Sequence, residues 1–194
     1  MLGGLAPAIA NDNVQSDFNA RCAACHQVDA GGNEALKAPA LAGLSVSYLT
    51  RQLEHFRDGL RGYAIEDVQG QMMAGVAKTL DDQQVEALAH YLSALPTINA
   101  PRPTAPTGFA ARGNYSSCTS CHGAAAEGFE ALGAPRLAGQ HSGYLQAQLE
   151  KFRNGQRGAH PDDLRGQQMR QMAEAIPNDA MIENLVRYVG QLGR

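Results

Sequence analysis

The chain contains four cysteines, arranged as two pairs, and a histidine directly follows the second cysteine of each pair. The two groups are Cys22, Cys25 and His26, and Cys118, Cys121 and His122. Thiols with two residues between them serve in disulfides, zinc sites, thiol redox centres and the covalent attachment of haem. The repeated histidine distinguishes between these uses.

A disulfide gives the histidine no role, and the βαβ pattern that accompanies a thioredoxin-like C-x-x-C is missing. A zinc ribbon places its two cysteine pairs within about 20 residues of each other, whereas these pairs are 96 residues apart. In covalent haem attachment, each thiol bonds one vinyl group of the porphyrin and the adjacent histidine binds the iron. The motifs therefore predict two covalently attached haem c groups, each with a histidine on its iron.

Both motifs lie inside a longer internal duplication. Residues 22–73 align with residues 118–169 without a gap, and about half of the aligned residues are identical. Of the six methionines, only Met73 and Met169 fall at matched positions, each 47 residues after its histidine. A ligand used by both copies should occupy matched positions, so we expect these two methionines to be the second axial ligands of the irons.

Other methionines and histidines have no counterpart in the second copy. We expect Met72, Met172 and Met181 to fill hydrophobic cores, with Met172 as a lesser ligand candidate. Four histidines are expected to be exposed or hydrogen-bonded rather than ligands, namely His55, His90, His141 and His160. A tuning role for His141 or His160 at one haem stays open.

Helical periodicity is present on the carboxyl-terminal side of each motif. Apolar residues recur at helical spacing in residues 45–60, 81–95, 141–155 and 178–192, and Ser45 or Ser47 is placed to cap the first of these helices. No run of alternating apolar residues indicates a strand. We predict an all-α fold of two tandem domains.

The domains are expected at residues 12–96 and 108–194, joined by a proline-rich linker at residues 97–107. Residues 1–11 are apolar and small, and contain Ala8-Ile9-Ala10, the A-x-A form of a signal-peptidase site. We interpret them as the remnant of an export signal or an artificial start. No stretch approaches the roughly 20 apolar residues of a spanning helix.

The formal net charge is −3 and no basic run occurs, which argues against a nucleic-acid partner. The charge is uneven, because residues 1–100 hold 6 Lys and Arg against 11 Asp and Glu, whereas residues 101–194 hold 10 against 8. The acidic first half and the basic second half are hypothesised to dock different partners.

With these features, the sequence resembles the dihaem cytochromes c4, a tandem of two class I cytochrome c domains. The resemblance begins near residue 14 and rests on C-A-A-C-H and C-T-S-C-H, on "APALAG" and "APRLAGQ" after them, and on "YLTRQLEHFRDG" and "YLQAQLEKFRNG". It implies an iron ligated by His26 and Met73, and a second by His122 and Met169. It also implies that the carbonyls of Pro39 and Pro135 accept a hydrogen bond from the two histidines.

The function that the resemblance implies is one-electron transfer in the periplasm between redox proteins, namely an electron donor and a terminal oxidase or reductase. Peripheral association with a membrane complex stays open. One alternative is an electron-transfer subunit of a larger dehydrogenase or oxidase complex. A dihaem enzyme such as a thiosulfate dehydrogenase or a peroxidase is a weaker alternative, because no cysteine is spare as a ligand and both irons are expected to be saturated.

Overall fold

Helices form where the periodic apolar residues predict them. The computed structural model describes the backbone of residues 9–98 and 109–192. Its first half contains α1 (Ile9–Arg21), α2 (Ala23–His26), α3 (Val46–Arg57), α4 (Val68–Ala77) and α5 (Asp82–Ala94). Its second half contains α6 (Phe109–Tyr115), α7 (Thr119–His122), α8 (Ser142–Arg153), α9 (Leu164–Glu174) and α10 (Asp179–Val189), with 3₁₀ turns at Ser116–Cys118 and Glu130–Leu132.

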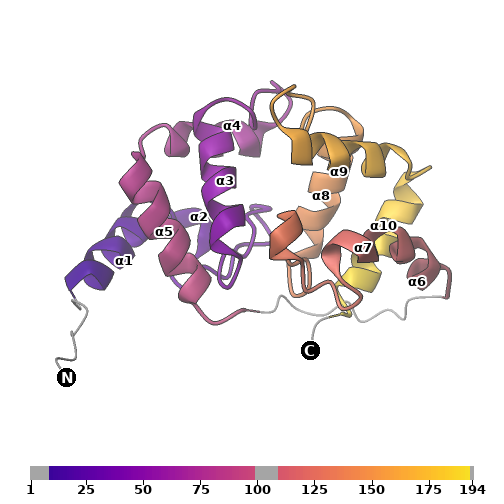
Figure 1. The fold of residues 1–194 in the computed structure, drawn as a ribbon, viewed down its shortest axis with the longest axis horizontal. Helices are drawn as coiled ribbons and strands as arrows, with labels where there is room; N and C mark the ends of the chain where they lie inside the picture. Colours follow the sequence, from indigo (N-terminus) through magenta and orange to yellow (C-terminus); the bar gives the residue numbers. More distant parts are fainter. Residues whose placement is uncertain (1–8, 99–108, 193–194) are drawn as a thin grey trace.

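The two halves lie side by side along the long axis of the molecule (Figure 1). Within the described ranges the only β-type pairings are two isolated bridges, Asn33 with Ala38 and Phe129 with Ala134. The prediction of an all-α fold is therefore confirmed. Most of the expected linker and the start of the chain, residues 99–108 and 1–8, lie outside the described residues. No helix in the described ranges combines the length and the apolar character needed to cross a bilayer.

The four predicted helices correspond to α3, α5, α8 and α10, and three of them begin at a side-chain cap. The Ser45 hydroxyl accepts a hydrogen bond from the backbone N–H of Tyr48, which confirms Ser45 as the cap of α3. Asp81 and Gln84 form a reciprocal capping box at the start of α5, and Asn178 caps α10. Such caps satisfy N–H groups that have no partner within the helix.

Each half has its own small hydrophobic core. In the first half, Phe18 of α1 packs with Leu49 of α3 and Leu88 of α5. In the second half, Tyr115 of α6 packs with Leu145 of α8 and Ile182 of α10. An aromatic pair closes each core: Phe18 with Tyr91 at 5.9 Å, and Tyr115 with Tyr188 at 5.6 Å between ring centroids.

Helices α4 and α9, which carry Met73 and Met169, lie along the same edge of the molecule (Figure 1). Each begins at a buried aspartate, Asp67 or Asp163. The carboxylate accepts a hydrogen bond of 2.8 Å from the N–H of a glycine three residues later, Gly70 or Gly166. The matched caps fix both methionine-bearing helices in the same way.

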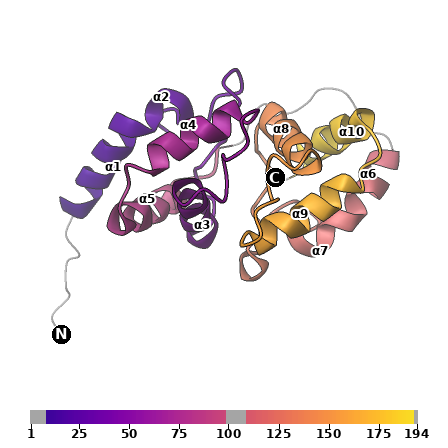
Figure 2. The same cartoon turned by 90° about the horizontal axis from the view of Figure 1, so that it is seen from above.

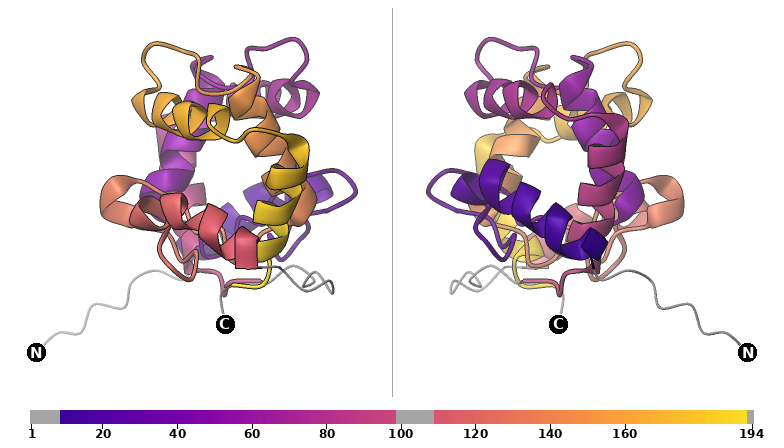
Figure 3. Two further views of the ribbon diagram at one scale, coloured as in Figure 1. Left: turned by 90° about the vertical axis from the view of Figure 1, so that its right-hand side faces the viewer. Right: turned by 90° about the vertical axis from the view of Figure 1, so that its left-hand side faces the viewer.

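Helices α3 and α8 face each other across the boundary between the halves (Figures 1 and 2). The side chain of Arg61 reaches Gln52 of its own half at 2.6 Å and Gln148 of the other half at 2.9 Å. Arg157 reaches Gln148 at 2.7 Å and Gln52 at 2.9 Å. These matched contacts relate the halves by a pseudo-two-fold axis, and both halves have a similar frame of helices when viewed end-on (Figure 3).

Candidate haem centres

The cysteine–histidine motifs fold into single helical turns, α2 and α7. Residues three and four apart lie on one face of a helix, so Cys22, Cys25 and His26 share one face. The backbone N–H of His26 donates to the carbonyl of Cys22 at 2.9 Å. The same spacing in the second copy gives α7 an equivalent face, and each turn thus presents two thiols and one imidazole together.

Both motif histidines are buried, with exposed fractions of 4% for His26 and 5% for His122. Nδ1 of His26 lies 2.9 Å from the carbonyl oxygen of Pro39, and Nδ1 of His122 lies 2.9 Å from that of Pro135. Because a carbonyl only accepts, Nδ1 carries the proton and Nε2 keeps its lone pair. The expected role of the two prolines is confirmed by this geometry, which orients each ring as an iron ligand requires.

Burial also keeps these rings neutral. It lowers the pKa of His26 and that of His122 below the ordinary histidine value, against the opposing effect of the proline hydrogen bond. Only a neutral imidazole has a lone pair to give to a metal. Both histidines are therefore in the protonation state that ligation needs.

The first cysteine of each motif is not set up for thiol redox chemistry, because burial raises the pKa of Cys22 and of Cys118. Within the described residues the cysteines form no disulfide, and the pKa of the Cys22 thiol is raised to about 11. A reactive cysteine has a lowered pKa. In the same part of the chain, no three His, Cys, Asp or Glu side chains gather as a zinc site would require.

The two matched methionines differ from Met72 and Met172 in their surroundings. Met73 is half-buried and packs against Phe56, Ala74 and Ala77, and Met169 is also half-buried. Met72 and Met172 are 61% and 42% exposed. The prediction that these two fill cores is wrong, because the buried sides of α4 and α9 consist of glycine and alanine. Met181 does pack against the second core, as predicted.

Two arginines that were not predicted as site residues lie between the halves and fit an anionic group. Arg51 and Arg61 each have a buried Nε–H without a hydrogen-bond acceptor in the described structure. Their other hydrogen bonds end on neutral groups, namely Gly133 for Arg51, and Gln52, Tyr144 and Gln148 for Arg61. Arg61 is buried and Arg51 is half-buried. Buried cations require a compensating charge, and the propionate carboxylates of haem are suitable anions.

His90, His141 and His160 are exposed or hydrogen-bonded, as predicted. The prediction is wrong for His55, which is half-buried and whose ring has no hydrogen bond among the described residues. His141 and His55 also join the halves. Nε2 of His141 lies 2.8 Å from the carbonyl oxygen of Gly31, and Nδ1 lies 3.0 Å from the Glu34 carboxylate. His55 faces Asp163 of the other half. His160 accepts a hydrogen bond from the Asp162 N–H, and His90 is exposed.

Gly32 keeps the Pro39 carbonyl in place for His26. It has a φ of +81°, and a Cβ at this residue would lie 2.5 Å from the backbone of Pro39 and Ala40. We expect Gly32→Ala to lower the free energy of unfolding of the first half by roughly 1–3 kcal/mol, measured by denaturant titration of the holoprotein. Gly75 is the matched control, because a Cβ there meets no atom within 4 Å. Equal effects of Gly32→Ala and Gly75→Ala would contradict this assignment.

Comparisons with known proteins agree with this geometry. The cytochrome c family model matches residues 12–96 and again residues 110–193. The thiosulfate dehydrogenase electron acceptor of Thiomonas intermedia is 39% identical to the chain. The alignment covers 73% of the chain and 67% of that relative. Cytochrome c4 of Azotobacter vinelandii is 32% identical to the chain, over 90% of the chain and 86% of that relative.

A solved thiosulfate dehydrogenase (TsdBA) from Marichromatium purpuratum superimposes on 96% of the chain with a TM-score of 0.77 and 31% identity. The chain spans 40% of the length of that protein. Two matches to the cytochrome c model, together with the cytochrome c4 relatives, establish two covalently bound haem c groups and an electron-carrying function. The chain therefore belongs to the cytochrome c family, as a dihaem electron carrier of the cytochrome c4 type.

Proposed function

We propose that Cys22 and Cys25 hold the first haem with His26 and Met73 on its iron, and that Cys118 and Cys121 hold the second with His122 and Met169. The observation that supports this most strongly is the matched pair of buried, neutral histidines. Each has Nδ1 fixed 2.9 Å from a proline carbonyl beside two thiols of the right spacing. Met73 and Met169 lie at matched positions on helices with matched caps.

The haem iron supplies a one-electron couple between its ferric and ferrous states. The protein positions and insulates that couple. The two thiols of each motif would anchor the porphyrin, the histidine would bind its iron, and the methionine would bind it as well and so exclude water and substrate. Methionine as the second ligand raises the potential, and an apolar surrounding has the same effect because the oxidised form carries the additional charge. A saturated iron favours electron transfer between proteins over chemistry on a bound substrate.

We further propose that this carrier works in the periplasm and accepts electrons from a dehydrogenase of the thiosulfate-oxidising class. This proposal is supported by the names of two relatives that are 39% and 35% identical to the chain, both thiosulfate dehydrogenase electron acceptors. Covalent haem on paired cysteines fits an exported protein. The excess of acidic residues in the first half and of basic residues in the second gives two surfaces of opposite charge for a donor and an acceptor.

Reduction kinetics test the proposed donor. The oxidised holoprotein is mixed with thiosulfate and a catalytic amount of a thiosulfate dehydrogenase, and haem reduction is followed by absorption. We expect reduction only when both are present, at a rate that changes with ionic strength because charged surfaces guide the encounter. Rapid reduction by thiosulfate alone would make the chain itself an enzyme. No reduction in the complete mixture, while a chemical reductant still reduces both haems, would overturn the choice of donor.

A further inference from the structure

The buried aspartates that cap the two methionine-bearing helices each face a basic side chain from the other half. Asp67, which caps α4, lies 2.5 Å from Nζ of Lys151 on α8. Asp163, which caps α9, lies 3.6 Å from Nδ1 of His55 on α3. Each half therefore places a base at the start of the helix that carries the proposed iron ligand of the other half.

These two contacts occupy matched positions but differ in chemistry. Lys151 and His55 align in the internal duplication, as do Asp67 and Asp163. A lysine ammonium keeps its charge throughout the physiological pH range, whereas a histidine gains or loses its charge within it. The charge at the cap of α4 is therefore fixed, and the charge at the cap of α9 depends on a proton.

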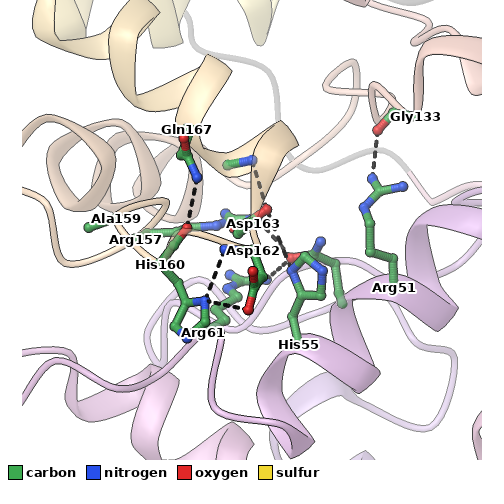
Figure 4. Close-up of polar contacts among 12 residues, drawn as sticks. Arg51, His55, Arg61, Gly133, Arg157, Ala159, His160, Asp162, Asp163 and Gln167 are labelled. Atoms are coloured by element: carbon green, nitrogen blue, oxygen red, sulfur yellow. Dashed lines mark hydrogen bonds and ion pairs between the residues drawn. The ribbon is translucent and has the colours of Figure 1, made fainter.

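The surroundings of His55 decide where that proton binds (Figure 4). The charged groups that face it are Asp163 from the start of α9, Arg157 from the segment after α8, Arg61 from the segment after α3, and Arg51 on α3 itself. Burial lowers the pKa of His55, the three arginines lower it further, and the Asp163 carboxylate opposes them. At 3.6 Å the contact is too long for a hydrogen bond, and it becomes an ion pair only when the ring is protonated.

We propose that His55 is a positioning residue for the second haem: its proton sets the charge beside Asp163, the cap of the helix that carries Met169, so that the potential of this haem depends on pH. Lys151 keeps the corresponding charge beside Asp67 constant, so the first haem lacks this dependence. The inference rests on the proposed ligation by Met169 and Met73.

The proton and the electron are linked in a balanced exchange. When a redox partner donates one electron to the second half, the charge there falls by one unit and the His55 ring binds a proton from water more readily. Loss of that electron returns the proton to water. By reciprocity, a proton on His55 favours the reduced state. The potential of the second haem should therefore rise as the pH falls through the pKa of His55, which lies below the ordinary histidine value.

An exchange of the two bases tests this inference. The potentials of both haems are measured by spectroelectrochemistry between about pH 5 and pH 8 in wild-type holoprotein, His55→Lys and Lys151→His. We expect His55→Lys to abolish the upward shift of the second potential at low pH, and Lys151→His to introduce such a shift at the first haem. Haem propionates and other groups titrate in all three proteins, so only the difference between the profiles counts. Identical profiles of wild type and His55→Lys would overturn the proposal.

A second pair of variants keeps the test decisive if a lysine at residue 55 prevents folding. His55→Gln is neutral at every pH, so its second potential should match wild type at high pH and lack the part of the low-pH rise that His55 contributes in wild type. Asp163→Asn keeps a good helix cap but removes the carboxylate. We expect the pKa of His55, followed by NMR of its ring protons, to be lower in Asp163→Asn than in wild type. An unchanged pKa would mean that the Asp163 carboxylate does not act on the His55 ring, and it would overturn the proposal.

Failure of this inference is distinguishable from failure of the proposed function. Substitutions of Met73 and Met169 could shift the two potentials while the His55 variants keep the pH profile of wild type. In that case the proposed ligands are supported and only the proton coupling is refuted. If those methionine substitutions leave both potentials unchanged, the ligand assignment is refuted. The proposed role of His55 is then refuted as well, because it rests on ligation by Met169.

Discussion

Met73→His and Met169→His should each lower the potential of one haem and leave the other nearly unchanged. Histidine stabilises the ferric state more than methionine does. We expect a drop on the order of 0.2 V, a fraction of the roughly 0.8 V range that axial ligands span. Spectroelectrochemical titration of each variant measures it. The transition that moves identifies the haem of the first or the second half.

Met72→His and Met172→His are the matched controls for this experiment. Both methionines lie on the same two helices but are 61% and 42% exposed. A histidine at these positions should leave both potentials where they are in wild type. A drop with Met172→His and none with Met169→His would transfer the ligand role to Met172.

The double substitution Cys22→Ser with Cys25→Ser should remove one haem and unfold the first half. Two missing thioethers leave only the proposed iron ligands, His26 and Met73, to hold the haem. The described core of this half is small, and its buried aromatic residues are Phe18 and Phe56. A domain of this size often needs a cofactor to complete its core, and loss of a bound group removes its contribution to folding.

Mass spectrometry and the pyridine haemochrome spectrum should give one haem per chain for this variant, and circular dichroism should lose roughly half of the helical signal. Cys118→Ser with Cys121→Ser is the reciprocal control, with loss of the other haem. Since each half has its own core, the second half should keep its haem in the first variant. Retention of two haems, or full helicity with one haem, would contradict this expectation.

The sequence predicted the features that depend on local spacing and on the internal repeat. Spacing of three and four residues places Cys22, Cys25 and His26 on one helical face without any tertiary information. The apolar periodicity predicted α3, α5, α8 and α10. Ser45 or Ser47 was predicted as the cap of α3 from its residue type, and Ser45 is the one that caps it. Comparison of the two copies selected Met73 and Met169, which are half-buried, from among methionines that include the exposed Met72 and Met172.

Features that depend on how the halves meet could not be read from either copy alone. Helices α4 and α9 bury glycine and alanine rather than large apolar residues, so their periodicity is weak. The contacts of Arg61 and Arg157 with Gln52 and Gln148 cross the boundary between the halves. All four residues are matched in the duplication, and that match could have indicated that they share a structural role. It did not reveal that they meet.

Aligned residues of different type in the two copies can still have the same role, and His55 is an example. Because it aligns with Lys151, the comparison set it aside as an unshared histidine. In three dimensions both side chains face a matched aspartate, Asp163 or Asp67. The shared property is a base at that position rather than a residue type. An alignment by charge would have paired these positions, whereas the alignment by identity separated them.

The most direct measurement of the central claim is a combined haem count and ligand spectrum of the oxidised holoprotein. Haem is quantified per chain, and the long-wavelength band of the methionine–iron bond is recorded by absorption and magnetic circular dichroism. We expect two haems per chain and a band intensity that corresponds to two methionine-ligated irons. A single haem, or a band that accounts for only one of two irons, would contradict the assignment of two complete His/Met centres.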